Sequence, residues 1–287
     1  KALSTATVQA LSTDQLSALT SGQVQALSSG QLQALGTAQV RDMASTQLAS
    51  LSSTQIKALT SSQLNILSLE SLQAIETADV KEMTTAQINA LTSAQVNNLS
   101  TDQVQALTTA QIRALTSSQL NGMADATVQA LTSTELQALT TAQAQSLTSA
   151  TLNTLTTDQV QTLTTAVVRA VSTTSLQGLS TDQLNALTSD QVLALSSSQV
   201  QALTTSQVQD VSTVQIEVLN SAQVKVLTSA QLNVLSSAAM QALSTTDVRA
   251  LTTGQVSALG AGQLNKLSTD QVQALSTTQI QSLDSAQ

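Results

Sequence analysis

Aliphatic residues recur every eight positions along the whole chain, with no insertion or deletion. Each eighth residue from Leu3 to Leu283 is Leu, Ile, Val or Met, in all 36 cases. A second aliphatic column starts at Val8 and breaks at one of its 35 positions, Ala144. A short period over a whole chain is typical of repeat architectures, in which neighbouring repeats bury a shared core.

The polar positions of each octad predict the start of a helix. Ser or Thr follows the first aliphatic residue in 29 of 36 octads, and Gln comes three residues later in 26 of 36. This is the spacing of a capping box, in which the hydroxyl accepts from the third backbone N–H and the Gln side chain reaches back to the N–H of the cap. Three octads have poor caps instead, namely Ala44, Glu76 and Ala124.

The charged residues fit the polarity of such helices. Acids lie in the first turn, where they complement the positive end of the helix dipole: Asp14, Glu70, Asp79, Asp102, Glu135, Asp158, Asp182, Asp190, Asp247 and Asp270. Eight of the nine basic residues share the column after the second aliphatic residue: Lys1, Arg41, Lys57, Lys81, Arg113, Arg169, Lys225 and Arg249. We expect this column to face water late in each helix.

Two other folds agree less well with the octad. In one continuous helix each octad would be rotated by about 80° from the last, so the aliphatic columns would never form a stripe. A β-solenoid would require β-branched strands and turn-forming residues at fixed places, whereas Leu, Ala and Gln between the caps are good helix formers. The second aliphatic residue and the next Leu are three apart, which places them on one helix face.

We therefore expect an all-α fold, a narrow α-solenoid of very short capped helices with one helix per octad. Two octads per coil is the packing we expect, although alternate octads do not differ in a way that would mark a 16-residue unit. Residues 1–287 are expected to form a single continuous array of about 36 octads that is a piece of a longer array.

The composition excludes most chemistry. Aromatic residues, His, Cys and Pro are absent, and the net charge is −8. The few basic residues are spread too widely to bind the phosphates of a nucleic acid. No apolar run approaches the ~18 residues of a transmembrane segment. We expect no catalytic residue, no cofactor and no metal, and hence a protein that is not an enzyme.

Two groups of acids are the best candidates for a calcium site. Asp182 and Asp190 lie one octad apart, and an irregular stretch gathers Glu70, Glu76, Asp79 and Glu82 around Lys81. Compensation of the helix dipole is the simpler interpretation of both groups. Four methionines fall in the aliphatic columns and are expected in the core: Met43, Met83, Met123 and Met240. Asn98-Leu99-Ser100 matches a glycosylation motif, but its Leu and Ser already have core and cap positions.

The repeat resembles the LTTxQVxA-type octapeptide arrays of very large bacterial secreted or surface proteins, some of which carry adhesin or haem-utilisation labels. A clean unit is Leu99-Ser100-Thr101-Asp102-Gln103-Val104-Gln105-Ala106. The resemblance covers the whole chain and implies an extracellular or cell-surface location. Haem ligation has no support, because the chain has no His or Tyr.

The functional expectation is a structural one: a spacer, stalk or filament. The alternative is a binding module, an adhesin for polysaccharide or an ice-binding surface, that uses the Ser/Thr and Gln ridges. Against it, Ser and Thr interchange freely, which a template of fixed spacing should not permit. We also expect self-association, end to end or lateral, because a head-to-tail contact that does not close produces a filament. Contact with a glycan or a cell surface is the other partner class considered.

Overall fold

The computed structural model describes residues 3–287. Over this range the chain forms short helices and no strand. Contacts divide the chain into two compact units, Lys1–Gln143 and Ala144–Gln287. The all-α expectation is confirmed for the described residues.

Within its described residues, 3–143, the first unit contains seventeen complete helices. They are α1 (Thr5–Gln9), α2 (Thr13–Ser17), α3 (Ser21–Gln25), α4 (Ser29–Ala34), α5 (Thr37–Arg41), α6 (Ser45–Ala49), α7 (Ser53–Ala58), α8 (Ser61–Asn65), α9 (Leu69–Gln73), α10 (Thr77–Glu82), α11 (Thr85–Ala90), α12 (Ser93–Asn97), α13 (Thr101–Gln105), α14 (Thr109–Ala114), α15 (Ser117–Asn121), α16 (Asp125–Ala130) and α17 (Ser133–Ala138).

Helix α18 (Thr141–Ser146) contains the boundary, and the second unit continues with the same spacing. Its other helices are α19 (Ser149–Thr154), α20 (Thr157–Thr162), α21 (Thr165–Ala170), α22 (Thr173–Gln177), α23 (Thr181–Ala186), α24 (Ser189–Ala194), α25 (Ser197–Ala202), α26 (Thr205–Gln209), α27 (Thr213–Glu217), α28 (Ser221–Lys225), α29 (Ser229–Asn233), α30 (Ser237–Ala242), α31 (Thr245–Ala250), α32 (Thr253–Ser257), α33 (Ala261–Leu264), α34 (Thr269–Ala274) and α35 (Thr277–Gln281).

Each octad forms one helix because its cap residue stops the helical backbone and restarts it. In the clean unit, Ser100 is extended, with φ −66° and ψ 159°, and its hydroxyl accepts from the N–H of Gln103. The helix closes with a tight turn in which the Leu107 N–H donates to the Val104 carbonyl at 3.0 Å. Every described helix starts eight residues after the one before it. The prediction of one capped helix per octad is therefore confirmed.

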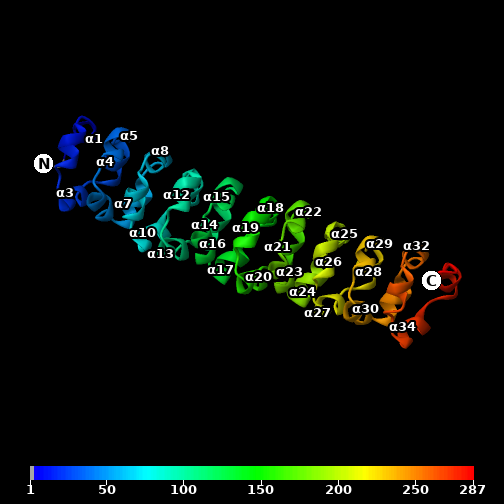
Figure 1. Cartoon of the computed structure of the whole chain (residues 1–287). Coiled ribbons are helices and arrows are strands. Elements are labelled where there is room, and N and C mark those ends of the chain that lie inside the picture. Colours follow the sequence, from blue (N-terminus) through cyan, green and yellow to red (C-terminus); the bar gives the residue numbers. More distant parts are fainter. Residues whose placement is uncertain (1–2) are drawn as a thin grey trace. The chain divides into compact units, whose positions relative to one another are not determined.

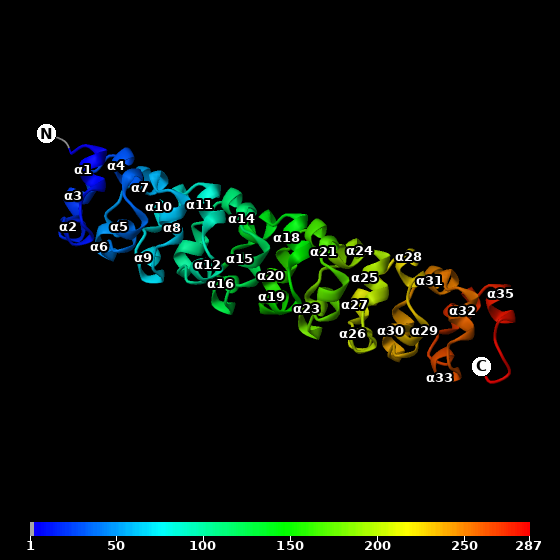
Figure 2. The same cartoon turned by 90° about the horizontal axis from the view of Figure 1, so that it is seen from above.

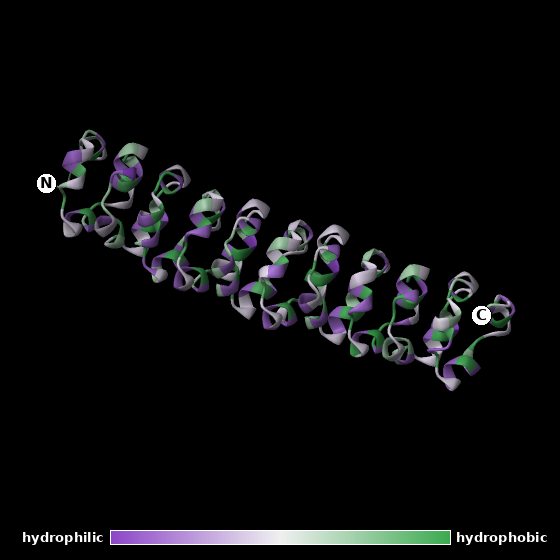
Figure 3. Cartoon of the chain, in the orientation of Figure 1, coloured by the Kyte–Doolittle hydropathy of each residue, from purple (hydrophilic) through white to green (hydrophobic). Residues whose placement is uncertain are grey.

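The two aliphatic columns form the core of each unit. Val104 is fully buried and Leu107 is 5 % exposed, and the equivalent residues of most octads are buried as well. They share one face of the octad, as their spacing of three predicts. Figure 3 shows hydrophobic and hydrophilic residues mixed within the short helices, so that every octad contributes to both core and surface.

The number of octads per coil differs from the expectation. Helices three apart in sequence pack against each other, for example α7 against α10 in the first unit and α21 against α24 in the second. These pairs lie side by side in both views (Figures 1 and 2). Hydrogen bonds from Gln side chains also reach the fourth helix back, as from Gln103 on α13 to Leu72 on α9. A coil therefore contains between three and four octads, and the expectation of two octads per coil is wrong.

The geometry of the Gln side chain explains the wider coil. The amide of each core Gln contacts carbonyls 28 to 31 residues earlier, as for Gln103 with Ile75 and Leu72. A 16-residue coil would place other groups beside that amide. Because the octads are nearly equivalent in sequence, no difference between alternate octads could have revealed this distance.

Candidate functional site

The most regular polar structure in the molecule is the column of buried Gln residues. The side chain of Gln103 is 2 % exposed. Its Oε1 accepts from the N–H of Ser100 at 3.0 Å, which completes the capping box. Its Nε2 donates to the carbonyls of Leu72 at 3.0 Å and Ile75 at 2.7 Å. One amide thus satisfies the start of its own helix and the end of a helix in the preceding coil.

The same pattern recurs in both units. In the first, Gln63 donates to the carbonyls of Leu32 and Leu35, both at 2.8 Å. In the second, Gln191 donates to those of Val160 at 2.9 Å and Leu163 at 2.7 Å. We call this contact the Gln link: a core Gln amide joined to carbonyls 28 and 31 residues earlier. Repetition of the Gln link ties successive coils together.

A second link leaves the exposed column after the Val position. Asn65 donates its side-chain amide to the Ala90 carbonyl at 3.0 Å, and Gln177 donates to the Ala202 carbonyl at 2.8 Å. Arg113 makes the same contact with the Ala138 carbonyl through Nε, at 3.2 Å. Each of these bonds spans 25 residues and joins a helix to the third helix after it. A helix is therefore linked both backwards and forwards along the solenoid.

Sequence reasoning found the capping half of the Gln link and missed the coil-to-coil half. A signal was present, because Glu satisfies a capping box as well as Gln does. Glu nevertheless occupies this column once, at Glu135, whereas Gln occupies it 26 times. The amide can both accept from the cap and donate elsewhere, whereas an ionised carboxylate can only accept. The preference for Gln over Glu therefore indicated a buried acceptor facing each side chain.

The predicted charge columns are confirmed where the structure describes them. Basic residues lie in the last turn of their helices and are exposed: Arg41, Lys57, Lys81, Arg113, Arg169, Lys225 and Arg249. Lys1 lies outside the described residues. Acids lie in the first turn, as Asp102 does on α13. The side-chain hydrogen bond from Arg41 to its neighbour Asp42 lowers the pKa of that exposed carboxyl.

The acids considered for calcium are not brought together. Asp182 and Asp190 are both exposed, on the first turns of α23 and α24. In residues 3–287, no three acidic side chains form a group that could hold a metal ion.

The irregular stretch from Glu70 to Glu82 is likewise dispersed. Glu70 and Glu76 are exposed, whereas Asp79 is 7 % exposed and accepts from the hydroxyl of Ser53 at 2.5 Å. Glu82 pairs with Lys57 at 3.5 Å, so its partner is on another helix and is not Lys81.

The methionines and the glycosylation motif lie where the octad places them. Met43, Met83 and Met240 are at most 4 % exposed, in the core, while Met123 is half-buried. In the motif, Leu99 is buried in the core and Ser100 caps α13. The Asn98 side chain donates to the Leu69 carbonyl at 3.1 Å.

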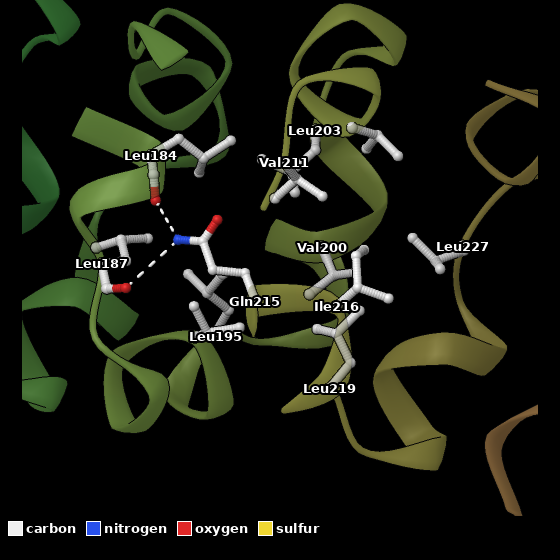
Figure 4. A pocket seen from close by; sticks show the side chains of 12 residues that line it. Leu184, Leu187, Leu195, Val200, Leu203, Val211, Gln215, Ile216, Leu219 and Leu227 are labelled. Atoms are coloured by element: carbon white, nitrogen blue, oxygen red, sulfur yellow. Dashed lines mark hydrogen bonds between the residues drawn. The ribbon is translucent and has the colours of Figure 1, made fainter. Parts of the chain in front are cut away.

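One variation of the Gln link lies beside a small aliphatic cavity of the second unit, which also contains a smaller one. Asn185 accepts from the N–H of Ser212 at 3.0 Å, in place of the capping Gln. Gln215 still donates to the carbonyls of Leu184 at 2.6 Å and Leu187 at 3.4 Å, and its Oε1 is buried without a partner (Figure 4). The aliphatic cavity at its side has a volume of about 40 Å³ and the second one about 20 Å³. Both are far too small for an ordinary ligand.

The cap hydroxyls of Ser and Thr accept hydrogen bonds from the helices that they start. The cap hydroxyl accepts from the third N–H of its helix, as Thr116 does from Gln119 at 3.1 Å. Two other hydroxyls, on Ser53 and Ser221, donate to buried carboxylates on Asp79 and Asp247. The bonds from Ser53 and Ser221 tie helices together.

None of the described helices is long and apolar enough to cross a membrane.

Comparison with known families agrees with this repeat geometry. A family model described as the ALTTAQ repeat matches residues 1–29, 27–61, 72–109, 168–197, 227–261 and 256–285, which together are more than half of the chain. The resemblance to an octapeptide repeat array is thus confirmed. No curated protein matches the chain.

Proposed function

Since the chain belongs to the ALTTAQ repeat family, we propose that it acts as a structural array, a spacer, stalk or filament whose length is set by the number of octads. The observation that supports this function is the Gln link, which recurs from coil to coil in both units with the same atoms. A protein held together only by nearest-neighbour contacts tolerates a change in repeat number, because every added repeat finds the same partners.

Removal of whole octads tests the proposal. Deletion of residues 44–99 joins Met43 directly to Ser100 and preserves the order of the columns. We expect small-angle scattering to show a maximum dimension that falls in proportion to the residues removed, with an unchanged cross-section. Circular dichroism per residue, which should not change, controls for folding. A maximum dimension that hardly changes, as for a compact particle, would exclude a spacer.

The setting we propose is extracellular or at a cell surface, in agreement with the secreted and surface arrays that the octad resembles. Protection of the array from added protease in intact cells would exclude that setting. We propose neither a catalytic activity nor a cofactor nor a nucleic-acid partner. The chain has no His or Cys to pair with a hydroxyl nucleophile, and the basic residues are separated.

Self-association belongs to the same proposal. Each coil packs on the next through the same aliphatic side chains, carbonyls and amides. A coil of a second copy presents the same groups and can therefore pack in the same way. We expect the sedimentation coefficient to rise with protein concentration. A single species with the mass of the monomer over the whole concentration range would contradict self-association.

Binding to a glycan or cell surface is the second candidate. One observation favours it, a shallow open hollow of about 470 Å³ whose lining is about half polar and includes Thr77, Lys81 and Gln105 beside Ala78, Ala106 and Leu107. Occupation of the cap hydroxyls by backbone N–H groups counts against a lattice of free hydroxyls. Selective binding on a glycan array that Lys81→Ala abolishes would promote this candidate over the spacer.

A further inference from the structure

Glu135 stands in the Gln column but cannot make a Gln link as a carboxylate. Its Oε2 accepts from the Thr132 N–H at 2.6 Å, so the capping half of the link is intact. The other oxygen, Oε1, then takes the place of the amide nitrogen. That oxygen is buried and has no hydrogen-bond partner, and the residue is 3 % exposed.

The register of the solenoid determines what Glu135 faces. Residues 31 and 28 positions earlier, which accept from the amide in a Gln link, are Val104 and Leu107 on and after α13. In a regular octad of the same unit, Gln119 donates to the equivalent carbonyls of Ile88 at 2.9 Å and Leu91 at 2.7 Å. An ionised carboxylate would thus oppose carbonyl oxygens in a buried position, which is costly.

The two aspartates of the same column avoid this conflict. Asp79 accepts from the hydroxyl of Ser53 at 2.5 Å, and Asp247 accepts from that of Ser221 at 2.8 Å. Their shorter side chains stop at a hydroxyl donor 26 residues earlier. Glu135 is longer by one methylene, and its Oε1 is left without a donor.

We propose that protonation of Glu135 controls a hydrogen bond between two coils. The neutral carboxylic acid donates Oε1–H to a carbonyl of the preceding coil, as the Gln amide does, and ionisation breaks that link. A neutral acid has the donor and the acceptor that the position requires, whereas a carboxylate has acceptors only. Burial raises the pKa of Glu135, and the hydrogen bonds from Thr132 oppose that rise.

No other charge in the surrounding helices of the first unit replaces the proton. The helices next to Glu135 in space or sequence are α13, α14, α16, α17 and α18, and their other charged residues are Asp102, Arg113 and Asp125. All three are exposed, and Arg113 donates to the Ala138 carbonyl at the far end of α17. A single carboxylate is a poor calcium site, because calcium takes 6–8 oxygen ligands. The proton is therefore the cation that fits.

The sign of the pH effect follows from the raised pKa. The stability that the neutral Glu135 contributes is fully present below the pKa that Glu135 has in the unfolded chain. This stability is lost as the pH rises through the higher pKa that Glu135 has in the folded chain. Glu135→Gln keeps the link at every pH. We expect the melting temperature of E135Q minus that of the natural chain to grow by roughly 2–4 °C between about pH 4 and about pH 9.

Two matched variants and a local measurement complete the test. Asp79→Asn should show no comparable growth, because Ser53 already serves that carboxylate. Gln119→Glu should acquire the pH dependence of Glu135 at a regular octad. Amide hydrogen exchange in α17 should accelerate with pH in the natural chain beyond its intrinsic dependence and not in E135Q.

Three results would overturn the proposal. The first is an equal pH dependence of melting in the natural chain and E135Q. The second is a Gln119→Glu variant whose melting temperature depends on pH no more than that of the natural chain. The third is stabilisation of the natural chain, but not of E135Q, by calcium chloride alone at the high end of the pH range, because a metal ion would then replace the proton.

Discussion

At the scale of the residue, the buried Gln is the centre of the architecture because one amide has two opposite tasks. Its oxygen caps the helix that contains it, and its nitrogen donates to carbonyls at the end of a helix in the preceding coil. Removal of such a side chain exposes unsatisfied groups on both sides, and an unsatisfied buried group costs more than the hydrogen bond itself contributes. The Gln residues of one octad should therefore differ greatly in importance.

Substitution at Gln103 and Gln105 tests this difference within one helix. Gln103→Ala leaves the Ser100 N–H and the Leu72 and Ile75 carbonyls without their side-chain partner. We expect it to lower the free energy of unfolding by about 2–4 kcal/mol. Gln105→Ala, on the exposed side of the same helix, should change it by less than about 0.5 kcal/mol. Urea denaturation measures both, and equal losses would refute a special role for the core amide.

At the scale of the element, the cap position was predictable from sequence because the capping box is local. The spacing of three between Ser or Thr and Gln lies inside one octad and needs no knowledge of the coil. The poor caps were predictable for the same reason: neither Ala44 nor Glu76 makes a side-chain cap bond. At Ser212, Asn185 accepts from the cap N–H in place of Gln215. This replacement was not predictable, because the two residues are thirty positions apart and only the coil brings Asn185 near Ser212.

Restoration of a missing cap should stabilise its helix. Ala44 already has extended backbone angles, φ −64° and ψ 148°, so a Ser fits there without strain. We expect Ala44→Ser to raise the free energy of unfolding by about 0.5–1 kcal/mol, since its hydroxyl can accept from the Gln47 N–H. Thr116→Ala, which removes a cap that is present, should cost a similar amount. Thermal melting measures the change in stability of both variants. An Ala44→Ser variant with unchanged stability would show that the cap hydroxyl contributes nothing there.

At the scale of the whole molecule, the fold class and the helix spacing could be predicted, whereas the coil could not. Leu107 and Val104 had to be buried together because they lie three apart. The distance from Gln103 to Leu72 is set by how far the chain turns at each extended cap, and no single octad records that angle. Because the octads are equivalent, the sequence also has no second, longer period that would show the number of octads per coil. The same equivalence predicts which deletions the molecule tolerates.

Deletion of one residue and deletion of one octad should have opposite effects. The Gln links of Gln207, Gln215, Gln223 and Gln231 all span the position of Ser206, which is exposed. Loss of Ser206 alone changes the spacing of these links by one residue, so each amide faces the wrong backbone group at a cost of about 1–3 kcal/mol. Loss of the whole octad 204–211 joins Leu203 to Ser212, and every amide finds an equivalent carbonyl. We expect the first variant to lose the cooperative melting of the second unit and the other to keep it. If both melt alike, the links do not set the register, and core packing alone holds the coils together.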